Sequence, residues 1–168
     1  EVLRAFVGIA KANGTEVRQG ESALRIIPCD GYVRVETSVA TYSTRKVVIA
    51  AGPWANDILQ TLGVSLPLRV TLEQYTFFHP AERALFAPDR FPVIAHHHSG
   101  NGGTATGYYA FPMFAGDGVK LGERNGGPSR LPQNGPGDPD PKRRERDIAY
   151  ARQIIPMLGD SVGETETG

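Results

Sequence analysis

Three consecutive histidines, His96, His97 and His98, form the most conspicuous group of side chains that could carry chemistry. Histidine nitrogens bind zinc, but adjacent residues of a strand point to opposite faces, so at most two of the three could reach one ion. No aspartate, glutamate or cysteine lies within the next few positions to complete a metal site. We therefore expect ordinary histidines at the end of a strand, with a metal site through His96 and His98 as the weaker alternative.

Lys120 stands between Val119 and Leu121 in a short strand-like segment, so its side chain is expected to point away from theirs. A lysine that points into a protein is destabilised unless it binds a ligand or an anion. Its neighbours alone favour the simpler interpretation of a lysine that faces solvent, and Tyr109 can likewise be an ordinary core aromatic. Residue spacing reveals no acid–base pair and no nucleophile triad.

Two further features do not indicate a reactive site. Residues 100–103 are Gly-Asn-Gly-Gly, but they precede a strand-like segment, whereas a dinucleotide-binding glycine loop joins a strand to a helix. We expect a hairpin loop there. Cys29 lies beside a predicted hairpin turn with no histidine nearby in the sequence, so nothing marks it as an activated nucleophile.

The elements that must position these residues begin with a helix, which apolar residues at three- and four-residue spacing predict. Asn13-Gly14 predicts the end of this helix. An Asp30-Gly31 turn predicts a hairpin, and an apolar run before Gly52 predicts a strand buried on both faces. Gly52-Pro53 then predicts a turn into a helix that closes at Gly63. The strands expected in this part cover residues 16–18, 23–27, 32–37 and 45–51.

The second part predicts an antiparallel sheet with a helix. Residues rich in Val, Thr, Tyr and Phe predict strands within 69–79, 91–98, 106–114 and 119–122. The Gly- and Pro-rich residues 125–141 predict a loop, and 140–158 a helix, whereas 159–168 predict no regular structure. The expected fold class is α+β: a β-meander and a buried strand, joined to a mostly antiparallel sheet with flanking helices.

Composition excludes several classes of protein. The chain has 168 residues with 18 Lys and Arg against 18 Asp and Glu, so no net positive charge would attract nucleic acid. No apolar run is long enough to span a membrane. The single cysteine, Cys29, excludes an internal disulfide and is typical of a reducing compartment such as the cytoplasm.

Taken in order, several segments of the chain resemble monomeric sarcosine oxidase and N-methyltryptophan oxidase, which are FAD-dependent amine oxidases of the D-amino-acid-oxidase type. The resemblance runs from about Val2 to Leu158. Its most specific parts are the Ala50-Ala51-Gly52-Pro53-Trp54 turn and the pair formed by Tyr108-Tyr109-Ala110-Phe111-Pro112 and Lys120-Leu121-Gly122.

The resemblance also implies that the chain is a central fragment. Family members begin with a G-x-G-x-x-G turn that holds the FAD pyrophosphate and end with the cysteine that binds flavin covalently in sarcosine oxidases. Neither is found here, and Cys29 does not correspond to that cysteine. We expect part of the FAD-binding domain over residues 1–63, the substrate and catalytic domain over 64–158, and a tail over 159–168.

Site residues carried over from the family fall on both parts. Ala23 matches a strand position that offers backbone groups to the adenine of FAD, and the turn Ala51, Gly52 and Trp54 matches the one that approaches the cofactor. Tyr109 matches the tyrosine that lines the substrate site. Lys120 matches the lysine beside the flavin that promotes reaction with O₂, where a fixed positive charge stabilises developing superoxide.

One position departs from the family, since Arg124 stands where related enzymes usually have histidine.

The resemblance implies oxidation of a secondary amine, an N-methyl amino acid such as sarcosine, to an imine, with FAD as cofactor and O₂ reduced to peroxide. Two alternatives remain open: an oxidase of another amino acid, and a non-catalytic fragment or binding module that does not bind FAD. We expect the isolated chain to be inactive and to self-associate.

Overall fold

The computed structural model describes residues 2–99, 105–114, 116 and 118–168, and the chain divides into two units, Glu1–Leu68 and Arg69–Gly168. The glycine-rich residues 100–103 lie outside the described residues. Unit 1 begins with α1 (Val2–Ala12), whose end at Asn13-Gly14 is confirmed. Gly14 has a φ of +82°, a conformation that glycine adopts without the strain that a Cβ brings.

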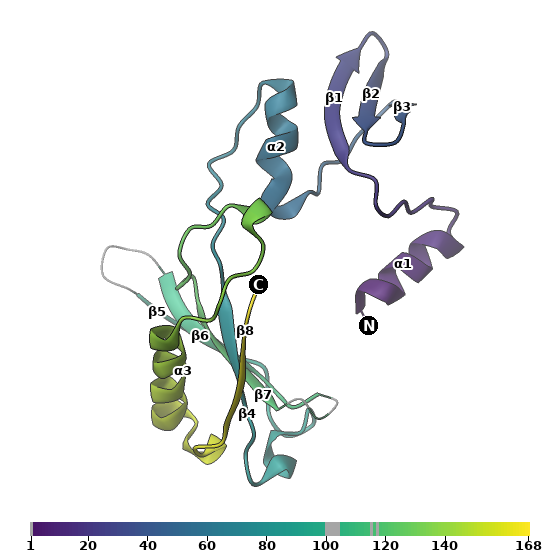
Figure 1. Ribbon diagram of the computed structural model, residues 1–168. Helices are drawn as coiled ribbons and strands as arrows, with labels where there is room; N and C mark the ends of the chain where they lie inside the picture. The colour runs from purple at the N-terminus through teal and green to yellow at the C-terminus, as the bar shows by residue number, and fades with distance from the viewer. Residues whose placement is uncertain (1, 100–104, 115, 117) are drawn as a thin grey trace. The chain divides into compact units, whose positions relative to one another are not determined.

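A three-stranded antiparallel sheet follows in unit 1, formed by β1 (Ala23–Cys29), β2 (Tyr32–Thr37) and β3 (Thr41–Thr44) in that order (Figure 1). The predicted hairpin is confirmed: Cys29 pairs with Tyr32, and Gly31 in the turn has a φ of +75°. Strand β3 was not expected, because its sequence Thr-Tyr-Ser-Thr offers little apolar pattern.

The chain then enters a 3-10 turn (Gly52–Trp54), α2 (Ala55–Leu59) and a second 3-10 turn (Gln60–Leu62). The helical segment therefore starts after Gly52 and ends at Gly63, as expected. The Thr61 hydroxyl accepts the backbone N–H of Ile26 at 3.1 Å, which ties this segment to β1. Ile26 is the only buried side chain among the described residues of unit 1.

Two strands predicted in unit 1 are wrong. Residues 16–18 and 45–51 carry no strand, and Val48, in the middle of the apolar run, is 89% exposed. A strand is held by hydrogen bonds to a neighbour, and no described strand pairs with either segment. Apolar composition alone therefore did not produce a strand over residues 45–51.

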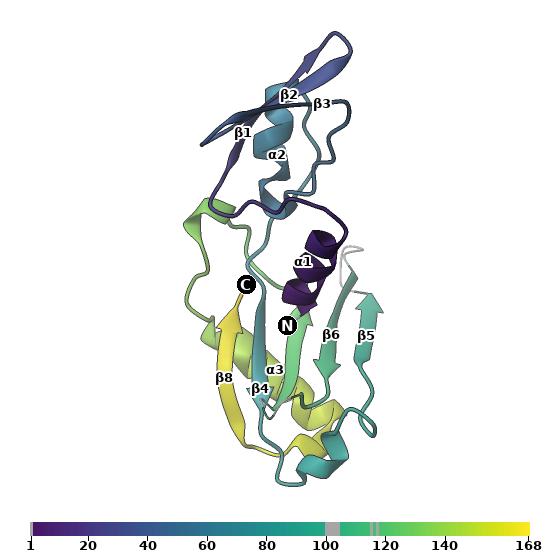
Figure 2. The same cartoon turned by 90° about the vertical axis from the view of Figure 1, so that its right-hand side faces the viewer.

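Unit 2 is built on a five-stranded antiparallel sheet (Figures 1 and 2). Helix α3 (Pro141–Ile154) covers one face of it, and the Asp140 carboxylate accepts the Lys142 N–H to cap that helix. The strands, in their order across the sheet, are β5 (Ile94–Ser99), β6 (Ala105–Phe111), β7 (Val119–Arg124), β4 (Gln74–Phe78) and β8 (Val162–Thr167).

The C-terminal residues correct a further expectation, because 162–167 form the edge strand β8 where no regular structure was predicted. β8 pairs with β4, with Gln74 opposite Thr167 and Thr76 opposite Thr165. Its sequence Val-Gly-Glu-Thr-Glu-Thr has one apolar side chain, so it carries the polar character of an edge strand rather than the alternation of a core strand.

The core of unit 2 lies between the sheet and α3. Burial alternates along β4, where Gln74, Thr76 and Phe78 are buried and the residues between them are half-buried. The residues that form the apolar core are Phe78, Phe86, Ala110, Met113, Val119, Leu121, Tyr150, Ala151, Ile155 and Leu158. The expected α+β class with mostly antiparallel strands is confirmed. One face of the sheet is buried against α3. The residues that alternate with these core residues along each strand lie on the opposite face.

Candidate active site

The candidate site lies on the face of the unit 2 sheet that points away from α3. Because Val119 and Leu121 of β7 are buried toward the helix, Lys120 between them points the other way, as its sequence position predicted. The strand register pairs Lys120 with Phe77 on one side and with Phe111 on the other. We call this surface the aromatic face; its residues are Tyr75, Phe77, Tyr109, Phe111 and Lys120.

Lys120 is the central cation of the aromatic face. Its ammonium nitrogen lies 3.5 Å from the ring centroid of Tyr75, and the described residues offer it no ion pair. Partial burial lowers the pKa of Lys120, while the negative charge of Glu166 has a smaller effect in the opposite direction. A half-buried ammonium without a carboxylate partner is available to an anionic group that approaches this face.

A hollow of about 310 Å³ adjoins Lys120 on this face. Its walls are apolar apart from the ammonium group: the residues are Phe77, Phe111, Pro112, Phe114, Gly118 and Lys120. Apolar aromatic walls with one positive charge suit a planar aromatic ligand that carries or develops negative charge.

Tyr109 shares the aromatic face with Lys120, from the neighbouring strand β6. Its ring meets that of Phe111 edge-on at 5.7 Å between centroids, and its strand partner is Gly122. A Cβ placed on Gly122 would come within 2.9 Å of the Tyr109 hydroxyl oxygen, so the missing side chain leaves room for the phenol. Burial raises the pKa of Tyr109, and the negative charges of Asp147 and Glu73 add to that effect.

Tyr75 and Glu166 were missed by the sequence analysis. The Tyr75 hydroxyl donates a hydrogen bond of 2.5 Å to the Glu166 carboxylate, which raises the pKa of Tyr75 to about 12. The two residues are 91 positions apart, and β8 was not expected, so no local signal could have joined them.

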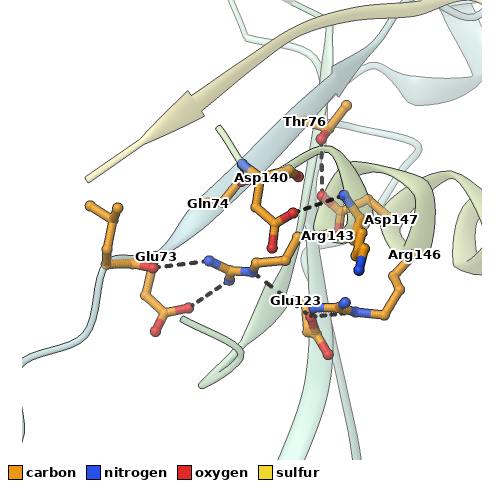
Figure 3. Close-up of polar contacts among 10 residues, drawn as sticks. Glu73, Gln74, Thr76, Glu123, Asp140, Arg143, Arg146 and Asp147 are labelled. Carbon is orange, nitrogen blue, oxygen red and sulfur yellow. Dashed lines mark hydrogen bonds and ion pairs between the residues drawn. The ribbon is translucent and has the colours of Figure 1, made fainter. Parts of the chain in front are cut away.

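A polar network on the opposite face attaches α3 to the sheet (Figure 3). Arg143 donates to the carbonyl oxygen of Leu72 and to the Glu73 carboxylate, while Arg146 donates to Glu123. The hydroxyl of Thr76 donates to Asp147 at 2.9 Å. Burial raises the pKa of Asp147 to about 7. This network was not predicted either. A signal was present, because Asp147 and Arg143 precede the core residue Ala151 by four and eight positions and so lie on the same buried face of the helix.

The cofactor residues expected in unit 1 fall on two segments. Ala23 opens β1 opposite Thr37, whereas Gly52 and Trp54 lie in the 3-10 turn before α2 and Ala51 is the residue that precedes and caps this turn. Gly52 has a φ of +53°, and a Cβ there would meet nothing within 4 Å. Its backbone conformation, rather than close packing, is what favours glycine in this structure.

His96 and His97 lie on opposite faces of the sheet. The Nδ1 atom of His96 lies 2.9 Å from the Tyr150 hydroxyl of α3, whereas the Nε2 atom of His97 lies 3.5 Å from Nη1 of Arg124. The side chain of His98 is outside the described residues. Within the part of the chain that the structure describes, no group of three His, Cys, Asp or Glu side chains could hold a metal ion.

Two smaller expectations concern Cys29 and membranes. The half-buried Cys29 thiol lies 3.6 Å from the carbonyl oxygen of Ile27 and forms no disulfide. Among the helices of the described residues, none has the length and apolar character needed to cross a membrane.

Known proteins resemble the chain in sequence over much of its length. It is 26% identical to monomeric sarcosine oxidase of Arthrobacter sp. (strain TE1826) over 121 residues, which are 71% of this chain and 30% of that protein. It is 32% identical to N-methyl-L-tryptophan oxidase of Escherichia coli O127:H6 over 125 residues, 74% of this chain and 31% of that protein. The chain therefore spans about a third of the length of these relatives.

Its fold also resembles a solved structure. NikD, described as an unusual amino acid oxidase essential for nikkomycin biosynthesis, superposes with a TM-score of 0.72 at 24% identity, over 98% of this chain and 42% of NikD. The family profile described as FAD dependent oxidoreductase (DAO) matches residues 1–168. The chain belongs to this family of FAD-dependent oxidoreductases.

Proposed function

We propose that this chain is the central part of a flavin-dependent amine oxidase. The enzyme oxidises a secondary amine, an N-methyl amino acid such as sarcosine, to an imine, and O₂ is reduced to peroxide. Residues 1–63 belong to its FAD-binding domain and residues 64–158 to its substrate domain. FAD, when bound, accepts the electrons of the amine and passes them to O₂.

The observation that carries this proposal is Lys120 on the aromatic face. Its ammonium group is half-buried and has no carboxylate partner among the described residues. Negative charge develops on O₂ as it is reduced, and a preorganised cation at that place lowers the barrier. The lysine holds this charge ready without a rearrangement of the protein.

The residues of the aromatic face fit a flavin ring. The hollow beside Lys120 has apolar aromatic walls, formed by Phe77, Phe111 and Phe114, against which a planar ring system can lie. Tyr109 lies on the same face, two residues before Phe111 on β6. In this proposal it lines the place where the amine binds. In unit 1, Ala23 offers backbone groups to the adenine, and the turn Ala51, Gly52 and Trp54 approaches the cofactor.

Substitution of Lys120 in the full-length protein tests the proposal. Lys120→Met should leave the anaerobic bleaching of bound flavin by sarcosine largely unchanged, but slow its reoxidation by O₂ about a hundredfold or more. Lys142→Met, which removes an exposed lysine of α3, is the matched control and should change neither rate. Purified protein without bound flavin, or a Lys120→Met enzyme that reoxidises at the normal rate, would overturn the proposal.

An oxidase of another amino acid is a second candidate, because Arg124 stands where related enzymes usually have histidine. This residue lies on the same strand as Lys120, four positions further, and adds a second cation beside His97. A second cation on this side of the sheet can pair with the carboxylate that N-methyl and unmodified amino acids both carry, so Arg124 changes the site without selecting between them. Anaerobic bleaching by a panel of N-methyl and unmodified amino acids distinguishes the two, because only a substrate reduces the flavin.

A further inference from the structure

Tyr75 lies on a strand whose two neighbours carry opposite charges, Lys120 on one side and Glu166 on the other. Strand β4 lies between β7, which carries Lys120, and β8, which carries Glu166 (Figure 2). The register pairs Tyr75 directly with Glu166, and Phe77, two residues further along β4, with Lys120. The Tyr75 ring therefore lies between the ammonium group and the carboxylate.

Each charge makes its contact with a different part of Tyr75. The Lys120 nitrogen lies 3.5 Å from the centroid of the ring, in the geometry of a cation–π contact. The Glu166 carboxylate accepts the hydrogen bond of the hydroxyl at 2.5 Å. The lysine and the glutamate form no ion pair with one another, although the negative charge of Glu166 raises the pKa of Lys120 against the larger effect of burial.

We infer that Tyr75 is a positioning residue that seats the Lys120 ammonium over its ring and, by donating its hydroxyl to Glu166, prevents a Lys120–Glu166 ion pair. The inference rests on the proposed function, in which Lys120 must keep its charge available. A carboxylate in direct contact would neutralise the lysine and hold it away from the reacting group. The phenol satisfies the carboxylate with a neutral hydrogen-bond donor instead.

Arg124 and Tyr109 lie on the same face, but their contacts are with other residues than Lys120 and Glu166. Arg124 on β7 lies beside His97 of β5 rather than beside Glu166. On β6, Tyr109 directs its hydroxyl toward Gly122. Tyr75 is therefore the described group that contacts both Lys120 and Glu166.

Three variants of the full-length protein separate the ring from the hydroxyl. Tyr75→Phe keeps the ring under Lys120 but frees Glu166, which can then pair with the lysine. Glu166→Gln removes the charge, and the double variant Tyr75→Phe with Glu166→Gln removes both the hydroxyl and the charge. Glu164→Gln, at a neighbouring exposed carboxylate of β8, is the control.

Two readouts follow these variants. One is the pH dependence of acetylation of the Lys120 amine by acetic anhydride, measured by mass spectrometry on the flavin-free protein; the other is flavin reoxidation by O₂. Tyr75→Phe should raise the pKa of Lys120 by about one pH unit and slow reoxidation about tenfold. The double variant should return both to near the original values, whereas Glu166→Gln alone should lower the pKa slightly and keep the rate.

A Tyr75→Phe protein with unchanged lysine reactivity, or a double variant as impaired as Tyr75→Phe, would overturn the inference. Failure of the proposed function gives a different pattern, because Lys120→Met would then reoxidise normally while the acetylation results still follow Tyr75 and Glu166. If Lys120→Met is slow but Tyr75→Phe leaves acetylation unchanged, only the positioning role fails.

Discussion

Gly122 shows at the scale of one residue how a missing side chain shapes the aromatic face. A Cβ there would come within 2.8 Å of the Gln74 carbonyl oxygen and 2.9 Å of the Tyr109 hydroxyl. The carbonyl belongs to β4 and cannot move without disturbing the sheet, so the strain falls on Tyr109 and on the strand pairing.

We expect Gly122→Ala to lower the free energy of unfolding by about 1–3 kcal/mol, because overpacking forces neighbouring groups apart. Urea unfolding measures the loss. Gly8→Ala is the control: Gly8 lies in α1 with nothing within 4 Å of an added Cβ, and alanine favours helix, so stability there should hold or rise. A Gly122→Ala protein as stable as the original would show that the sheet accommodates the methyl group.

Asp147 gives the structure a pH dependence. Burial raises its pKa from 3.8 to about 7, with the charge of Glu123 adding to the effect and the Thr76 hydrogen bond opposing it. The folded state thus binds this proton more tightly than the unfolded state. The stability that it provides is fully present below the unfolded pKa and is lost as the pH rises through about 7.

Asp147→Asn removes this titration while its amide oxygen can still accept from Thr76. The free energy of unfolding of the variant, relative to the original protein, should therefore rise by about 3 kcal/mol between pH 5 and pH 8. Urea unfolding at the two pH values measures it. Asp138→Asn, in the exposed loop, should show no such trend. A constant difference between the Asp147→Asn and original proteins would mean that Asp147 is ionised throughout this range.

At the scale of elements, α3 is attached to the sheet by charge as well as by apolar contact. Arg143 is 3% exposed and donates to Leu72 and Glu73, with Glu123 also within 4.0 Å. Arg152, near the end of the same helix, forms its ion pair with Asp160 in solvent.

Arg143→Met should lower the free energy of unfolding by about 3 kcal/mol, because it leaves the half-buried Glu73 and Glu123 without this partner. Arg152→Met removes the same side chain from an exposed pair and should change stability by less than about 1 kcal/mol. Thermal and urea unfolding of the two variants compare them directly. Equal losses would mean that burial does not strengthen the Arg143 contacts.

The elements also show where sequence reasoning succeeds. Helix ends and turns were predicted because Gly14, Gly31 and Gly63 adopt positive φ, a local property that residue type reveals. Lys120 was placed on the opposite side from Val119 and Leu121 by the two-residue period of a strand. Such features depend only on near neighbours in the sequence.

What failed depends on partners that are distant in the sequence. The apolar run 45–51 looked like a central strand but pairs with no described strand, whereas the polar residues 162–167 became a strand because β4 offered an edge. The contact between Tyr75 and Glu166 depends on that same pairing. The family resemblance thus named Lys120 and Tyr109 as site residues, but their common face and the arrangement that holds the lysine depend on strand pairing and could not be predicted.

At the scale of the whole molecule, the two units differ in how much they bury. Unit 2 has an apolar core of ten buried side chains, whereas Ile26 is the only buried side chain among the described residues of unit 1. No described residue of α1 is buried, and Leu3, Phe6 and Ile9 on this helix are each at least 60% exposed. An apolar stripe of this kind tends to associate with other apolar surfaces.

We therefore expect the 168-residue chain, expressed by itself, to self-associate. Light scattering should show a mass that rises with concentration, and replacing Leu3 and Phe6 with Gln should shift the chain toward the monomer by removing apolar area. Arg4→Gln, an exposed polar change on the same helix, is the control and should leave the mass unchanged. A clean monomer at high concentration, or an equal effect of Arg4→Gln, would mean that the α1 stripe does not drive association.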